Sequence, residues 1–191
     1  MYKRLNTENI NNYRANLING KLYWNNEISL NINELNQNIK MIKQLNISFE
    51  KKEDFIKRKN PKVSVVITLH NRENYIKLVY SSIYIQELKD IEIIFVDDAS
   101  NDNTSLIISE LMEKDKRIIY LKIDINKRAY YSRNRGILES KGECIIVIDS
   151  DDILINNILI KAYETAKTFG LDIINPQHIY TCSILYNIKN Y

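Results

Sequence analysis

Glycine, proline, cysteine and tryptophan are scarce in this chain of 191 residues, which contains four, two, two and one of them. The two cysteines, Cys144 and Cys182, lie too far apart to form a metal-binding or redox motif. Cys144 sits in an apolar run, so we interpret it as a buried structural thiol. No glycine-rich loop follows the first predicted strand, which argues against a P-loop or a dinucleotide-binding fold.

Long apolar runs and a strong charge of either sign are also missing. No run is long enough to span a bilayer, and the first residues lack the apolar core of a signal peptide. The net charge of +3 is too small to indicate attraction to nucleic acid or to a membrane. We therefore expect a cytoplasmic protein, either free or peripheral to a membrane, with no nucleic-acid partner and no transmembrane segment.

The composition that remains is that of a globular protein, with 45% hydrophobic and 27% charged residues. Residues 1–60 differ from the rest because they are rich in asparagine and lack a strand-like apolar run. Apolar residues recur at near-helical spacing between 32 and 55. We expect a helical or irregular N-terminal extension that packs on the main domain, on a partner or on a second copy. Pro61 marks the boundary to a domain over 61–191.

After Pro61 the pattern alternates between β-branched apolar runs and segments of helical period. Strands are predicted at 62–69, 91–96 and 117–123, from Cys144 onward, and from 171 to 174. Helices are predicted at 73–88, from about 103 to 113, at 130–140 and at 156–169. This alternation predicts parallel βαβ units, and therefore an α/β fold with an open, mostly parallel, Rossmann-like sheet.

The run from Cys144 to Asp152, CIIVIDSDD, is the most informative stretch of the chain. A strand that is apolar on both faces stops abruptly at Asp149, Ser150, Asp151 and Asp152. Neighbouring carboxylates repel one another, and a divalent cation with hard oxygen ligands is their usual counter-charge. The alternative is a solvated acidic loop that caps the next helix.

Two other predicted strands end in polar side chains. The first is followed by His70 and Asn71 after Thr68, and the second ends at Asp97 and Asp98. Ligands of open parallel sheets lie outside the carboxyl ends of the strands, so these groups should meet at one edge. With no phosphate loop present, a carboxylate-bound cation could hold the phosphates of a ligand there.

Four motifs occur in order: VSVVITLHNRENYI, DIEIIFVDDASNDNT, SRNRG and CIIVIDSDD. In this order and spacing they resemble the nucleotide-sugar-binding half of a family-2 glycosyltransferase of the GT-A fold. The resemblance covers about Lys62 to Asn175. It implies transfer of a sugar from a nucleoside-diphosphate sugar, a UDP-sugar foremost, to a glycan, lipid or protein acceptor.

The resemblance also implies roles for individual residues. Nucleotide-sugar binding is implied for Thr68, His70, Asn71, Asp97, Asp98, Arg133 and Asp149, and metal binding for Asp149 and Asp151. Asp98 would accept a hydrogen bond from the base, with Asp97 supporting the loop. Asp151 would bind the Mn²⁺ or Mg²⁺ ion that bridges the diphosphate, and Asp149 would face the ribose or a metal-bound water. Arg133 would lie near the donor phosphates.

Some of these residues also have simpler structural interpretations. Asp97 and Asp98 could form a turn and a helix cap, and Arg133 could be a solvated helix residue. His70 departs from the aromatic residue common in the family, so we expect it to line the pocket and not to act as the catalytic base.

No candidate for the catalytic base is found, and family members extend roughly a domain further than Tyr191. We therefore expect a truncated donor half, whose alternative function is that of a pseudoenzyme that binds nucleotide-sugar without transferring it. A receiver or phosphatase domain also pairs aspartates around magnesium. Such a domain needs a nucleophilic aspartate after the first strand, where this chain has 68–71 (Thr-Leu-His-Asn).

Overall fold

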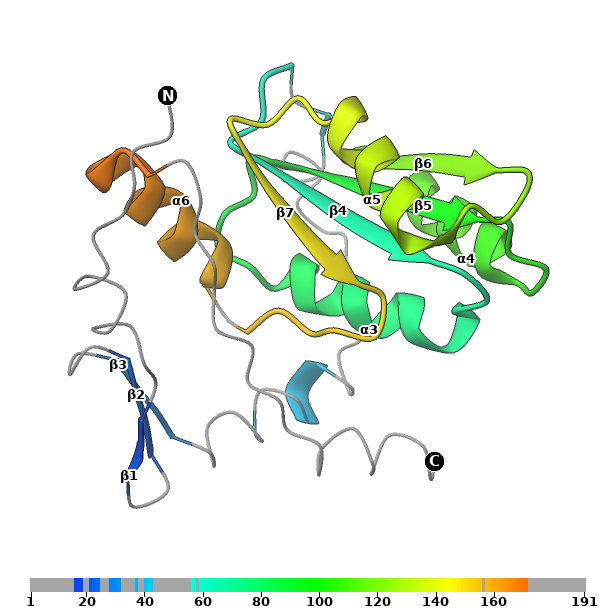
Figure 1. Ribbon diagram of the computed structural model, residues 1–191. Helices are drawn as coiled ribbons and strands as arrows, with labels where there is room; N and C mark the ends of the chain where they lie inside the picture. The colour runs from blue at the N-terminus through cyan, green and yellow to red at the C-terminus, as the bar shows by residue number, and fades with distance from the viewer. Residues whose placement is uncertain are drawn as a thin grey trace.

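The computed structural model describes residues 16–18, 21–24, 28–31, 37, 40–42, 56–57, 59–155 and 157–171 (Figure 1). Its main part is a four-stranded sheet with helices on both faces. Within the described ranges, no helix combines the length and the apolarity that crossing a bilayer requires.

The sheet is entirely parallel. Its strands are β4 (Val63–Leu69), β5 (Ile91–Asp98), β6 (Ile118–Ile123) and β7 (Cys144–Asp149), in the spatial order β6-β5-β4-β7. The chain moves outward from β4 through β5 to β6 and then returns to place β7 on the other side of β4. This order reverses between β4 and β7, which makes the gap between their carboxyl ends the topological switch point of the sheet.

The helices divide between the two faces. They are α3 (Glu73–Tyr84), α4 (Thr104–Lys114), α5 (Arg128–Glu139) and α6 (Ile158–Phe169). Helices α3 and α4 cover one face, and α5 covers the opposite face over β4 and β5 (Figure 1). The α/β fold with an open parallel sheet, predicted from the alternation, is thereby confirmed.

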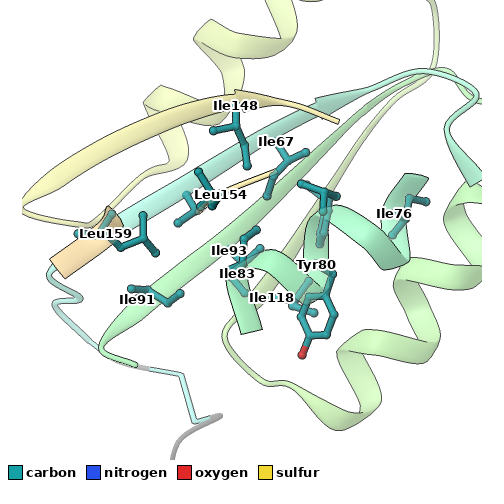
Figure 2. Packing of buried hydrophobic residues seen from close by; sticks show 14 of the residues in the cluster. Ile67, Ile76, Tyr80, Ile83, Ile91, Ile93, Ile118, Ile148, Leu154 and Leu159 are labelled. Carbon is teal, nitrogen blue, oxygen red and sulfur yellow. The ribbon is translucent and has the colours of Figure 1, made fainter. Parts of the chain in front are cut away.

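The larger core lies between the sheet and α3. Odd-numbered positions of β4 and β5, such as Ile67 and Ile93, meet Ile76 and Ile83 of α3 there, and Leu159 of α6 joins them (Figure 2). The other face has a smaller core around Val66, Ile94 and Val96. Both central strands are buried along their whole length, which explains why most of their residues are apolar.

Helix α5 approaches the sheet closely because it presents a glycine. A Cβ atom at Gly136 would lie 2.3 Å from Cγ1 of Val66 and 3.0 Å from Cγ2 of Val96. Neither valine can move far inside a packed core. The lack of a side chain at this position therefore sets the distance between α5 and the two central strands.

The N-terminal region differs from the helical or irregular extension expected for residues 1–60. Three short antiparallel strands, β1 (Asn16–Ile18), β2 (Lys21–Trp24) and β3 (Ile28–Asn31), form a separate sheet. The Asn-Gly pair between β1 and β2 is a strong hairpin signal that the low apolar content of the region concealed. Residues 40–42 are helical, as the near-helical spacing there suggests.

The predicted boundaries are accurate to a few residues. Strand β5 continues through Asp97 and Asp98, which were expected just after the strand, and α3 ends at Tyr84 and not at 88. Residues 172–174 of the last predicted strand lie outside the described residues, as does Cys182.

Candidate functional site

The candidate site lies at the carboxyl edge of the sheet, at the switch point. Thr68 of β4 is opposite Asp149 of β7 in the strand register, and Leu69 is opposite Asp97 of β5. Three strand ends therefore bring the predicted residues to one edge, as parallel pairing requires. Their side chains nevertheless have very different surroundings.

Asp97 is completely buried and fully hydrogen-bonded within the chain. Its Oδ1 accepts the backbone N–H of Ser100 at 2.9 Å, and its Oδ2 accepts the hydroxyl of Tyr120 at 2.6 Å. A carboxylate in this state supports the β5–α4 loop and does not face a ligand. This geometry corresponds to the supporting role expected for Asp97.

Asp98 is almost as buried, but only one of its two carboxylate oxygens has a hydrogen-bond partner among the described residues. Its Oδ1 accepts the backbone N–H of Lys127 at 2.7 Å, which joins the start of α5 to the end of β5. Among the described residues, Oδ2 of Asp98 has no hydrogen-bond partner. A carboxylate oxygen of this kind, on a side chain that is otherwise buried, can accept a strong hydrogen bond from a ligand N–H group.

His70 and Asn71 form a chain of hydrogen bonds over the same edge. The Nδ1–H of His70 must donate to the carbonyl oxygen of Asp98 at 2.6 Å, because a carbonyl cannot donate. Nε2 then accepts the side-chain amide of Asn71 at 3.3 Å, and Oδ1 of Asn71 accepts the backbone N–H of Asn101 at 2.8 Å. These bonds hold the ring of His70 in one orientation at the edge.

The backbone at this edge adopts left-handed conformations. Asn71, Ala99 and Arg128 have φ values of 53°, 60° and 70°, and each lies shortly after the end of β4, β5 or β6. Such conformations are unfavourable for residues other than glycine and occur often at binding sites. Only one other described residue that is not glycine, Asn157, has a positive φ.

Asp149 and Arg133 form an ion pair at the switch point. Nη2 of Arg133 lies 2.7 Å from Oδ1 of Asp149, and the side chains of Arg133 and Asp149 are 43% and 49% exposed. The hydroxyl of Thr68 donates to the same oxygen at a long 3.5 Å. Unlike Asp97, this pair is open to solvent, so a ligand can compete for both of its members.

The acidic turn after β7 leaves Asp151 exposed and Ser150 buried. In the part of the chain that the structure describes, no group of three or more acidic, histidine or cysteine side chains could hold a metal ion. Asp149 and Asp151 are nonetheless hard oxygen donors in the number that a Mg²⁺ or Mn²⁺ site uses when substrate phosphates and water complete the coordination. The residues present therefore fit such an ion, provided that the ligand brings oxygens of its own.

Tyr120, Ser100 and the backbone N–H of Lys127 were not identified from the sequence. Tyr120 lies on β6. Its burial, and to a lesser extent its hydrogen bond to Asp97, raises the pKa of its hydroxyl. The hydroxyl of Ser100 accepts the backbone N–H of Asn71 at 2.8 Å and so ties two loops together. A tyrosine in an apolar strand and a serine in a polar loop give no sequence signal for these roles.

Comparison with known proteins identifies the family. The model of glycosyl transferase family 2 matches residues 64–189. The chain belongs to glycosyl transferase family 2. The resemblance that the four motifs carry is therefore confirmed.

Individual glycosyltransferases agree with this assignment. The chain is 34% identical over 112 residues to glycosyltransferase GlyG of Streptococcus pneumoniae, covering 59% of this chain and 37% of that protein. It is also 34% identical over 108 residues to the GalNAc(5)-diNAcBac-PP-undecaprenol beta-1,3-glucosyltransferase of Campylobacter jejuni, covering 56% and 35%. This family-2 chain thus spans little more than a third of the length of either relative.

The fold is similar to that of a solved structure with a bound nucleotide-sugar. S. aureus TarS 1-349 in complex with UDP-GlcNAc matches with a TM-score of 0.53 and 24% identity, over 63% of this chain and 38% of TarS 1-349. The GT-A fold expected from the motifs is consistent with this likeness and with the all-parallel sheet.

Proposed function

We propose that this chain binds a nucleoside-diphosphate sugar, in particular a UDP-sugar, and supplies the donor side of a metal-dependent glycosyl transfer. The observation that carries the proposal is the arrangement at the switch point. A buried carboxylate with one unpaired oxygen, Asp98, and a solvent-open ion pair, Arg133–Asp149, end on the same sheet edge. The first suits a nucleobase and the second suits a diphosphate.

Asp98 is the proposed contact for the base. The imide N–H of uracil is a donor, and Oδ2 of Asp98 is an acceptor without a partner among the described residues. Because Asp98 is 4% exposed, the low local dielectric strengthens a charge-assisted bond formed there. Thr68, His70 and Asn71 line the same edge, and we propose that they contact the base or ribose.

Arg133 is the proposed contact for the diphosphate. Its guanidinium is paired with Asp149 but remains 43% exposed, and arginine can bind two phosphate oxygens at once. We propose that Asp149 and Asp151 hold a Mg²⁺ or Mn²⁺ ion. When bound, the ion would stabilise the negative charge that develops on the departing diphosphate.

The acceptor side of the reaction is not assigned to any described residue. Glu164 is the carboxylate of α6, and its neighbour Tyr163 bonds to Glu143, which precedes β7. Glu164 therefore belongs to a segment near the amino edge of the sheet, away from the strand ends that carry the site. This placement favours the alternative in which the chain, by itself, binds the donor without transferring the sugar.

We propose a glycan or a lipid-linked sugar as the acceptor of the complete enzyme. The Campylobacter relative is named for transfer to an undecaprenol-diphosphate-linked glycan. Its similarity to this chain covers 56% of this chain.

Titration calorimetry with UDP in the presence of Mn²⁺, and again with EDTA, tests the proposal. Binding should be measurable with Mn²⁺ and lost with EDTA. Equal affinity in both conditions would remove the metal from the proposal, and no binding in either condition would overturn donor binding itself.

Matched variants make this experiment more specific. Asp151→Asn should weaken binding in Mn²⁺, whereas Asp124→Asn, an exposed carboxylate just after β6, should not. If both variants behave like the wild type, the carboxylates after β7 do not bind the ion.

A further inference from the structure

The outward side of α5 is apolar, although a surface helix usually exposes polar side chains there. The exposed apolar side chains of this helix are Tyr130 (78%), Tyr131 (47%), Ile137 (39%) and Leu138 (82%). We call these four residues the outer face of α5. They lie on the side of the helix opposite Ser132 and Gly136, which are buried against the sheet. The helix is thus apolar on the side that nothing in the described structure covers.

Basic side chains surround this outer face. Between Lys122 and Lys141 there are six basic and two acidic side chains, a net charge of +4, whereas the whole chain carries +3. Arg128 and Arg135 flank the outer face, and Arg135 is paired with Glu139 at 3.2 Å. Ile125, in the loop before α5, adds a further apolar side chain that is 69% exposed. The small net charge of the chain therefore conceals a strongly basic region.

The opposite face of the sheet offers a useful contrast. Helix α4 has one largely exposed apolar side chain, Leu106 at 58%, and acidic residues such as Glu110 and Glu113 lie near it in sequence. Isolated exposed leucines are common on protein surfaces and need no partner. The four clustered side chains of α5, within a basic region, are not explained in this way.

We propose that the outer face of α5 binds the surface of a lipid bilayer that contains anionic lipids. Helices that lie in the membrane interface combine aromatic and aliphatic side chains with flanking lysine and arginine. Tyrosine suits this depth because its ring is apolar and its hydroxyl can reach water and headgroups. Long basic side chains extend toward the headgroups and gain from the negative surface potential.

Two other occupants fit the surface less well. A symmetric dimer through this face would place two regions of net charge +4 against each other, and such like-charge contact is unfavourable. A nucleic acid would use the basic side chains but leave the four apolar ones in water. A bilayer with anionic lipids satisfies both sets at once.

The position of α5 links this surface to the candidate site. Arg133, on the same helix, is paired with Asp149 at the switch point. Docking through the outer face would therefore place the rim of the site close to the membrane, where a lipid-linked acceptor would be. The proposed membrane contact does not depend on donor binding, since the four side chains take no part in it.

Vesicle flotation of the purified chain tests this inference. The chain should float with vesicles of phosphatidylcholine and phosphatidylglycerol, and less with vesicles of phosphatidylcholine alone or at high salt. The double variant Tyr130→Ser/Leu138→Ser, which keeps every basic residue, should bind the anionic vesicles roughly tenfold more weakly. UDP affinity, measured in parallel without vesicles, should not change, so that failure of this proposal and failure of donor binding are distinguishable.

The matched control is the double variant Leu106→Ser/Phe169→Ser, which removes two exposed apolar side chains from α4 and α6. It should bind vesicles as the wild type does. Equal binding by the α5 variant and the wild type, or equal binding to neutral and anionic vesicles, would overturn the proposal. So would self-association in sedimentation velocity that the α5 variant abolishes, because the outer face would then be an interface between two copies.

Discussion

Each edge of the central sheet carries an arginine–aspartate ion pair, but the two pairs differ in their exposure to solvent. At the amino edge, Arg117 and Asp115 form an ion pair in which both side chains are 0% exposed, and Tyr80 donates to the same carboxylate at 2.9 Å. At the carboxyl edge, Arg133 and Asp149 form a pair of equal length, 2.7 Å, that is about half exposed. The difference lies in access, because a ligand can reach only the second pair.

The amino edge is also closed by a second buried network. Glu92, which is 4% exposed, accepts the hydroxyl of Ser64 and the backbone N–H of Lys141, each at 2.5 Å. The hydroxyl of Ser64 in turn accepts the backbone N–H of Gly142 at 2.8 Å. Both donors meet Oε1 of Glu92, so this network ties β4, β5 and the segment before β7 to one another, whereas Asp98 at the other edge joins the end of β5 to the start of α5.

The largest expected effect comes from breaking the buried ion pair. Arg117→Met would leave the carboxylate of Asp115 buried without its cation and should lower the free energy of unfolding by about 3–5 kcal/mol. Urea denaturation measures this loss. The double variant Asp115→Leu/Arg117→Met should lose less than the two single variants together, because no unpaired charge remains. A single-variant loss below about 1 kcal/mol would contradict the role given to this pair.

The second network should have a smaller effect of the same kind. Glu92→Met would remove the acceptor of two donors and should lower the free energy of unfolding by about 2–3 kcal/mol. Glu92→Gln keeps an acceptor oxygen in the same place and should recover much of that loss. If the glutamine variant is as unstable as the methionine variant, packing and not hydrogen bonding accounts for the effect.

At the carboxyl edge, the expected effect is on affinity and not on stability. Asp98→Asn can keep the bond to the N–H of Lys127 but loses the charge of the carboxylate. The free energy of UDP binding, measured by calorimetry, should become less favourable by about 1–3 kcal/mol. The midpoint of thermal unfolding should change little. Asp124→Asn is the matched control, because this exposed carboxylate follows the neighbouring strand β6. Equal behaviour of the two variants would move the base-binding site away from Asp98.

The smallest expected effect is that of removing the carboxylate of Asp102. Its Oδ2 accepts the backbone N–H of Glu73 and its Oδ1 that of Thr104, so it binds the first backbone N–H of both α3 and α4. Burial acts to raise the pKa of Asp102, but the hydrogen bonds from Thr104 and Glu73 outweigh it and hold the pKa below its usual value. Asp102→Ala should therefore lower the free energy of unfolding by about 1 kcal/mol at neutral pH.

The pH dependence of this effect follows from the direction of the shift. A lowered folded-state pKa contributes stability that is present above the unfolded-state pKa of about 4 and is lost as the pH falls through the folded-state value. The wild type and Asp102→Ala should thus converge in stability in acid. Chemical denaturation at a series of pH values measures the difference, and a constant difference down to strong acid would exclude the ionised carboxylate as its source.

The main sheet is predictable from the sequence because both of its central strands are buried on both faces. A largely apolar run that stops at polar residues, such as His70 after β4 and Asp98 at the end of β5, indicates the strand and its candidate functional end together. The three N-terminal strands are not predicted from apolar runs, because they are short and lie in an asparagine-rich region. The Asn-Gly pair between the first two of them is the signal that indicates a hairpin there.

The position of the candidate site could be predicted from the sequence, but the role of each of its residues could not. Asp97 and Asp98 are adjacent and chemically identical, yet one is saturated by Ser100 and Tyr120 and the other is not. Likewise, Asp102 resembles an ordinary loop carboxylate until its two helix caps are seen. These distinctions depend on contacts between residues far apart in the chain, which periodicity and spacing do not encode.

The missing side chain at Gly136 has a mechanical consequence for the rest of α5. The helix rests directly on Val66 and Val96, so it has little freedom to slide or lift without moving β4 and β5 as well. Arg133 lies three residues before Gly136 on the same helix. Its position therefore depends on the contact between α5 and the two strands. A methyl group added at 136 would tilt the helix, change the length of the bond to Asp149 and reorient Tyr130 at the far side. One glycine thus fixes the relative position of an ion pair on one side of the helix and an exposed apolar surface on the other.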